Sequence, residues 1–106
     1  KIINLNNRAL GMVKQWQDMQ YGGRYSSISY EDSLPDFVKL AESFGHVGLK
    51  VEKFSDLNDA MEEAFSLKDK LVFLDVLIDP DEHVYPMLEA GGSMSEMRIS
   101  KKDKTF

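Results

Sequence analysis

The feature that most constrains the fold is the run from Leu71 to Ile78, in which every residue except Asp75 is apolar. The run is too short to cross a bilayer, because a membrane-spanning helix needs about 20 apolar residues. Apolar side chains on both faces are typical of a strand in a parallel sheet that helices cover on both sides. At Asp75, a buried carboxylate paired with neighbouring groups is favoured over an acid with a tuned pKa. The run therefore predicts a strand of a parallel sheet that is covered on both faces.

The rest of the chain alternates strands and helices. Ile2–Leu5 and Val47–Val51 have the composition of short strands. Apolar spacing predicts three helices, and the Gly/Ser/Tyr-rich segment Gly22–Ser33 is predicted to be a long loop. The resulting order is strand, helix, loop, helix, strand, helix, strand, followed by a tail. This order predicts an α/β fold with a layered parallel sheet and crossover helices.

Two of the predicted helices have recognisable starts. Pro35 suits the first turn of the second helix, because its missing N–H would have no partner there, and Gly45 is placed as the C-terminal cap. Ser55 is expected to cap the third helix, with Asp56 in its first turn. In the second helix, apolar residues at i, i+3, i+4 and i+7 spacing are Phe37, Leu40, Ala41 and Phe44. In the third, the predicted buried face is Leu57, Ala60, Met61 and Ala64.

Composition excludes several classes of protein. The 106 residues allow one domain, and the formal net charge of −5 argues against nucleic-acid binding through phosphate neutralisation. The chain has no cysteine, so a disulfide framework, a zinc knuckle and a thiol nucleophile are excluded. No membrane span or signal-peptide pattern is found, which makes the cytoplasm the expected location. Because the chain opens inside a strand without an initiating Met, we expect it to be a piece of a larger protein.

Asn6 and Asn7 follow the first predicted strand, at the end of the sheet where α/β proteins bind ligands. An asparagine carbonyl there can bind Mg²⁺, a cation that takes oxygen ligands. Taken alone, the pair favours a simpler interpretation, a turn held by Asx hydrogen bonds.

Met12, Trp16 and Met19 share one side of the first predicted helix. Large adaptable side chains of this kind can line a pocket for an apolar ligand. Periodicity alone favours ordinary core packing of an amphipathic helix.

Three segments resemble the catalytic large subunit of acetohydroxyacid synthase, also called acetolactate synthase. They are Asn6-Asn7-Arg8-Ala9-Leu10-Gly11-Met12-Val13-Lys14-Gln15-Trp16-Gln17, Leu34-Pro35-Asp36-Phe37-Val38-Lys39-Leu40-Ala41-Glu42, and His83-Val84-Tyr85-Pro86-Met87 followed by Gly91-Gly92. They occur in the family's order and cover nearly the whole chain. The resemblance implies the C-terminal part of a thiamine diphosphate-binding domain over residues 1–79, and an arm that covers the active site over residues 80–106.

The resemblance also implies roles for individual residues. Asn7 would bind Mg²⁺ through its side-chain oxygen and Ala9 through its backbone carbonyl, while Asn7, Gly11 and Met12 would contact the cofactor. The substrate channel would be lined by Met12, Trp16, Ala90 and Gly91. No residue of this chain is assigned a catalytic role, because the family's activating glutamate belongs to an N-terminal domain of the partner subunit.

The implied enzyme decarboxylates pyruvate on thiamine diphosphate and transfers the hydroxyethyl unit to pyruvate or 2-oxobutanoate, in branched-chain amino-acid biosynthesis. The cofactor carries the chemistry and the protein positions it. The family also binds FAD, at a site outside this chain, and works as a homodimer with a separate regulatory small subunit. The piece alone is expected to be inactive. The alternative is a standalone acidic α/β module for binding or regulation.

Overall fold

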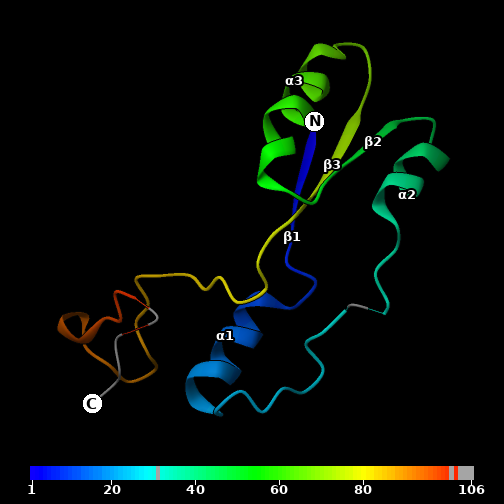
Figure 1. The fold of residues 1–106 in the computed structure, drawn as a ribbon. Helices are drawn as coiled ribbons and strands as arrows, with labels where there is room; N and C mark the ends of the chain where they lie inside the picture. Colours follow the sequence, from blue (N-terminus) through cyan, green and yellow to red (C-terminus); the bar gives the residue numbers. More distant parts are fainter. Residues whose placement is uncertain (31, 101, 103–106) are drawn as a thin grey trace.

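A three-stranded parallel sheet forms the centre of the molecule (Figure 1). The computed structural model describes residues 1–30, 32–100 and 102. The strands are β1 (Ile2–Asn6), β2 (Val47–Val51) and β3 (Val72–Leu77), in the spatial order β1-β3-β2. β3 lies in the middle, paired on both edges and largely buried. The prediction of a parallel strand from the apolar run is confirmed, and the structure adds its central position.

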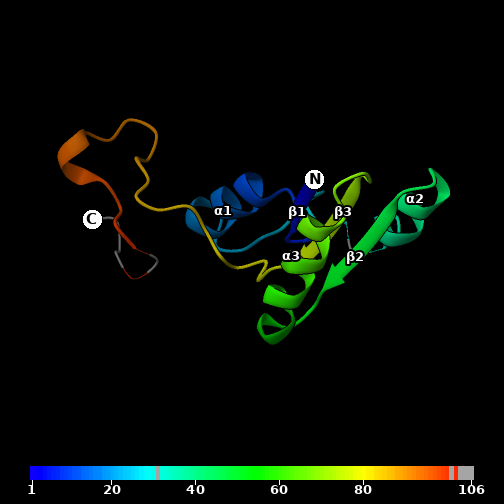
Figure 2. The same cartoon turned by 90° about the horizontal axis from the view of Figure 1, so that it is seen from above.

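Three helices accompany the sheet. They are α1 (Gly11–Gln20), α2 (Phe37–Ser43) and α3 (Leu57–Ser66), with short 3-10 turns at Phe54–Asp56 and Met94–Glu96. Helices α2 and α3 pack on β2 and β3, whereas α1 lies beyond the end of β1, next to the loop and the tail (Figures 1 and 2). The predicted element order and the layered α/β fold are confirmed.

The two faces of the sheet pack differently. Towards α3, a core of Val51, Leu74 and Val76 receives Leu57, Ala60 and Met61 of the helix, as their spacing predicts. Towards α2, the ring of Phe37 stacks on Phe73 with 5.4 Å between centroids. Gly48 allows this close approach, because a Cβ there would lie 2.6 Å from the Cα of Val38.

The start of α2 differs from the prediction. The helix begins at Phe37 and its N-cap is Asp36, whose carboxylate accepts hydrogen bonds from the N–H groups of Val38 and Lys39, both at 3.1 Å. Pro35 therefore lies before the cap, because the Asp36 carboxylate satisfies two helix donors and so fixes the first helical residue two positions after Pro35. Two residues of the predicted apolar face are exposed, Leu40 by 41% and Phe44 by 73%. Phe44 follows the last helical residue, and Gly45 then turns the chain with a φ of +76°.

The start of α3 also differs from the prediction. Ser55 lies inside the 3-10 turn and its hydroxyl donates to the carboxylate of Asp56 at 2.7 Å, so it does not cap the helix. Asp56 occupies the N-cap position without a side-chain cap hydrogen bond. The preceding 3-10 turn supplies the entry to the helix, which is a common use of this geometry.

The loop and the tail are irregular. Residues 22–33 form the predicted loop, in which position 31 lies outside the described residues. Within the described part of this loop, Ser29 forms an isolated bridge with Ala9. The tail from residue 80 contains one bridge, between Met87 and Arg98. Its lysine-rich end lies outside the described residues at positions 101 and 103–106. Within the described part of the chain, no helix has the length and apolar character to span a bilayer.

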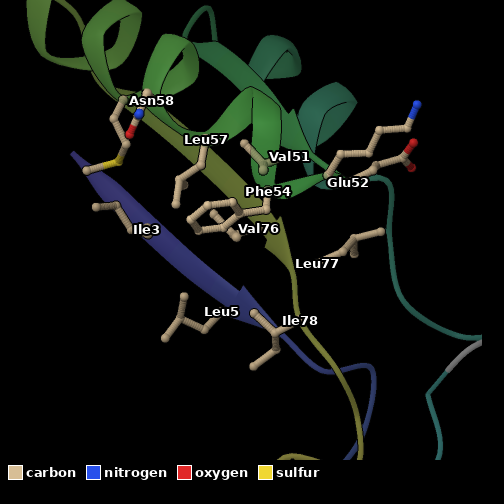
Figure 3. Close-up of a pocket in the computed structure, with 12 residues that line it drawn as sticks. Ile3, Leu5, Val51, Glu52, Phe54, Leu57, Asn58, Val76, Leu77 and Ile78 are labelled. Carbon is tan, nitrogen blue, oxygen red and sulfur yellow. The ribbon is translucent and has the colours of Figure 1, made fainter.

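An apolar hollow lies on the α3 side of the sheet, between β1 and the start of α3 (Figure 3). Ile3 and Leu5 of β1 line it together with Val76, Ile78 and Phe54, and Phe54 is 91% exposed. Clustered exposed apolar surface of this kind favours association.

We expect the isolated 106-residue chain to self-associate through this apolar surface. Sedimentation velocity over a range of concentrations tests the expectation, and a Leu5→Lys variant should shift the chain towards monomer. A wild-type chain that remains monomeric at high concentration would contradict it.

Candidate functional site

The end of β1 turns through two consecutive asparagine side chains. The Oδ1 of Asn6 accepts a hydrogen bond from the N–H of Arg8 at 3.0 Å, and the Oδ1 of Asn7 accepts one from the N–H of Ala9 at 3.2 Å. Arg8, which follows Asn7, has a φ of +57°. The Asx turns suggested by the residues alone are confirmed. They place Asn7, half-buried, at the carboxyl end of the parallel sheet.

Asp75 fixes the position of this turn. Its buried carboxylate accepts hydrogen bonds from the Nδ2 of Asn4 at 2.8 Å and from the Nδ2 of Asn6 at 3.2 Å. Asn4 is also its register partner on β1. The interpretation of Asp75 as a carboxylate paired by its neighbours is confirmed. Asp75 holds the strand whose end carries Asn7.

Next to Asn7, helix α1 begins without a side-chain cap. Its N-cap residue is Leu10, so no side chain satisfies the first N–H groups of the helix. The Nδ2 of Asn7 lies directly over Gly11, where an added Cβ would be only 2.6 Å away. The oxygen of Asn7 accepts one hydrogen bond, and a carbonyl oxygen has two lone pairs, so it keeps the capacity to bind a cation. An amide oxygen with a free lone pair and a helix start without a side-chain cap, both at this end of the sheet, fit a hard cation together with an anionic group.

Helix α1 buries polar residues and exposes apolar ones. Met12 is 52% exposed and Trp16 41%, whereas Lys14 is 7% exposed and Gln15 only 1%. Core packing of Met12 and Trp16, which periodicity alone favoured, is therefore wrong for this chain, because α1 packs against the loop and the tail and not against the sheet. Met19 is half-buried.

Two glutamines that sequence reasoning missed attach α1 to its surroundings. Gln15 donates to the carbonyl of Val84 at 2.9 Å and accepts from the N–H of the same residue at 3.0 Å. Gln17 pairs in the same way with Ser26, at 3.2 and 3.0 Å. The two glutamines flank Trp16 in the Gln15-Trp16-Gln17 sequence. This pair of glutamines was the only feature of the sequence that could have indicated their role.

A cluster of charged residues extends the attachment of the tail. The ammonium of Lys14 donates to Asp18 at 3.0 Å and to Asp81 at 2.5 Å, and it lies 4.7 Å from the centre of the Tyr25 ring. The Nε2 of His83 shares a hydrogen bond with Asp18 at 2.8 Å, and the hydroxyl of Tyr25 donates to the same carboxylate. Two residues of the tail, Asp81 and His83, thus bind one helix.

The electrostatics of this cluster favour its charged forms. Burial opposes the charge of Lys14, but hydrogen bonds to Asp81, Tyr25 and Asp18 outweigh it and raise the pKa of the ammonium. Burial likewise opposes the charge of Asp18, but hydrogen bonds from Tyr25 and Lys14 lower the pKa of its carboxyl. Because this pKa is lowered on folding, Asp18 stabilises the folded chain above its ordinary pKa, and the contribution is lost as the pH falls through the lowered value.

Ala90 and Gly91 lie further along the tail, in an exposed turn. Gly91 has a φ of +83°, and the N–H of Gly92 donates to the carbonyl of Glu89 at 3.0 Å. Arg98 forms an ion pair with Glu89 at 2.6 Å, which closes this part of the tail on itself. The assignment of Ala90 and Gly91 to a substrate channel stays a prediction.

The parallel sheet has an asparagine turn and an uncapped helix start at its carboxyl end, where α/β domains bind ligands. Residues 1–76 match the family model "Thiamine pyrophosphate enzyme, C-terminal TPP binding domain", and the chain belongs to this family. The thiamine diphosphate expected from the sequence is the cofactor that defines the family.

Within that class, the chain is similar to large subunits of acetolactate synthase, which confirms the resemblance found in the sequence. It is 59% identical to "Acetolactate synthase large subunit" of Haemophilus influenzae over 94% of the chain. It is 54% identical to "Acetolactate synthase isozyme 3 large subunit" of Escherichia coli K12 over 98% of the chain. A more distant relative is "Acetolactate synthase" of Mycobacterium bovis, 39% identical over 95% of the chain. The chain spans only 17%, 18% and 17% of these proteins, respectively.

Proposed function

We propose that this chain is part of an acetolactate synthase large subunit, and that the whole enzyme condenses pyruvate with a second 2-oxo acid. The observation that carries the proposal is the placement of Asn7 at the carboxyl end of the sheet, where its amide nitrogen lies over Gly11 at the uncapped start of α1 and its oxygen accepts a hydrogen bond from the N–H of Ala9. This geometry suits a cation that bridges the protein to a diphosphate. The similarity to acetolactate synthase large subunits supports the choice of reaction.

The residues that would hold the cofactor come from one corner of the chain. Asn7 would bind Mg²⁺ through its side-chain oxygen and Ala9 through its backbone carbonyl, while Gly11 and Met12 would present helix N–H groups to the diphosphate. The thiamine ring, when bound, stabilises the negative charge that decarboxylation leaves on the substrate carbon. The chain's own part is to bind the diphosphate end and orient it. FAD would bind to a part of the enzyme outside this chain.

The exposed side of α1 would face the substrates. Met12 and Trp16 leave a large apolar surface uncovered, which suits the carbon chain of a 2-oxo acid such as pyruvate or 2-oxobutanoate. Residues 1–79 would then form the end of the cofactor domain and residues 80–106 the arm, with Ala90 and Gly91 at the channel. The active enzyme would be a cytoplasmic homodimer with a separate regulatory subunit.

We expect the 106-residue chain on its own to bind thiamine diphosphate weakly and to form no acetolactate, because one asparagine and one carbonyl are too few ligands for the cation. Calorimetry with Mg²⁺ and cofactor measures the first property, with the full-length subunit as the positive control. Micromolar binding by the chain alone would show that the cofactor site is complete without other segments. A full-length subunit that makes no acetolactate from pyruvate would refute the proposed function.

We expect Trp16→Leu in the full-length enzyme to reduce the preference for 2-oxobutanoate over pyruvate as acceptor. The indole supplies a flat apolar wall for the extra methylene of 2-oxobutanoate, and contacts with one methylene are worth about 1–3 kcal/mol. Competition between the two acceptors measures the ratio of products. Tyr21→Leu, which removes another exposed aromatic ring one residue beyond α1, is the matched control. An unchanged product ratio in Trp16→Leu would remove Trp16 from the acceptor site.

A further inference from the structure

We infer that Gln15 is a positioning residue, whose carboxamide clamps the tail to α1 and so holds the tail beside the helix that carries Met12 and Trp16. The inference rests on the proposed function, because it takes the exposed side of α1 as the acceptor site. In the proposed function, Gln15 touches neither the cofactor nor the substrate.

The clamp is a complete set of hydrogen bonds. The Nε2 of Gln15 donates to the carbonyl of Val84 at 2.9 Å and to the sulfur of Met87 at 3.0 Å, and its Oε1 accepts from the N–H of Val84 at 3.0 Å. The side chain therefore binds Val84 as a neighbouring strand would, through both backbone groups. Because Gln15 is 1% exposed, water cannot replace these bonds easily.

The position of the clamp on α1 connects it to the acceptor site. Gln15 follows Met12 by three residues, so the two side chains lie on neighbouring parts of one face of α1, whereas Trp16, the next residue after Gln15, points in a different direction. The buried side of α1 binds the tail, and the exposed side presents Met12 and Trp16. Loss of the clamp loosens the tail at Val84, while the ion pair of Lys14 with Asp81 and the hydrogen bond between Asp18 and His83 still link the tail to α1.

The clamp can be tested in the full-length subunit with Gln15→Met, which keeps the volume of the side chain and removes every hydrogen bond to Val84. Hydrogen exchange measured by mass spectrometry on the peptide that contains Val84 should become about 10-fold faster, since that amide loses its acceptor. The KM for the acceptor acid should rise about 5-fold, with kcat within about 2-fold of wild type. A purely structural role would lower the melting temperature and leave the KM unchanged.

Gln17→Met is the matched control, because Gln17 makes the equivalent pair with Ser26 of the loop. It should speed exchange in the peptide that contains Ser26 and leave the Val84 peptide unchanged. Gln15→Leu serves as a second variant if Gln15→Met does not fold, because it likewise removes both the donor and the acceptor that bind the backbone of Val84.

Three results would count against this inference or the proposal beneath it. Unchanged exchange at Val84 in the folded Gln15 variants overturns the clamp. Faster exchange with an unchanged acceptor KM overturns its positioning role. A wild-type subunit that forms no acetolactate refutes the proposed function, and with it the positioning role, whereas the exchange experiment still decides whether Gln15 holds the tail.

Discussion

Replacing Asn7 with alanine is expected to lower the rate of the full-length enzyme about 100-fold at a fixed, limiting concentration of Mg²⁺, as the loss of a metal ligand or its support does elsewhere. The physical reason is the loss of the amide oxygen that lies at the carboxyl end of β1. A methyl group cannot replace it as a ligand for a hard cation. Steady-state rates measured against Mg²⁺ and thiamine diphosphate give the size of the effect.

The same variant shows whether the rate depends on metal binding by Asn7 or on the Asx turn that Asn7 makes with Ala9. If metal binding is lost, the apparent affinity for Mg²⁺ should fall and a large excess of the cation should restore part of the rate. If only the turn mattered, the apparent affinity for Mg²⁺ would stay as in the wild type and excess cation would not restore the rate of Asn7→Ala. Asn58→Ala, on the exposed surface of α3, is the control for an asparagine away from the site. Full activity in Asn7→Ala would end the assignment of Mg²⁺ to this corner.

Much of the fold could be predicted from the sequence, because local patterns determine it. The apolar run of β3 predicted a parallel strand covered on both sides, and the apolar spacing of α3 predicted the side that meets the core. The helix starts were less predictable. Asp36 and Ser55 are both good N-cap residues, and which of several neighbouring polar residues caps a helix depends on local geometry.

The environment of α1 could not be predicted, because its partners are far away in the chain. Gln15 binds a residue 69 positions later, and Lys14 binds one 67 positions later. A periodicity argument assumes that apolar side chains mark the buried side. In α1 the tail supplies backbone and carboxylate groups instead of an apolar surface, so polar side chains are buried and Met12 and Trp16 remain exposed. A local rule that fails in this way is typical of a functional surface.

Replacing Asp75 with alanine is expected to lower the free energy of unfolding of the 106-residue chain by about 2–4 kcal/mol, since each buried donor left unpaired costs about 1–3 kcal/mol. The donors are the Nδ2 groups of Asn4 and Asn6, which both bind the Asp75 carboxylate from β1. Asn4 is half-buried, so water can replace part of the hydrogen bonding that its amide loses. The expected loss of stability is therefore smaller than the cost of two fully buried unpaired donors. Urea unfolding followed by circular dichroism measures the change.

The Asp75 variant also tests how the sheet supports the candidate site. Asn6 ends β1 and is tied to Asp75, so loosening that bond displaces the turn that carries Asn7. We therefore expect Asp75→Ala in the full-length enzyme to weaken Mg²⁺-dependent cofactor binding, although Asp75 is not itself a proposed ligand. Asp69→Ala, in the exposed turn before β3, controls for the loss of a carboxylate. A stability loss of less than about 1 kcal/mol would mean that water solvates both amides, because an unpaired buried donor costs at least that much. The edge of the sheet at Asn7 would then have to be held by the backbone pairing of β1 and β3 alone.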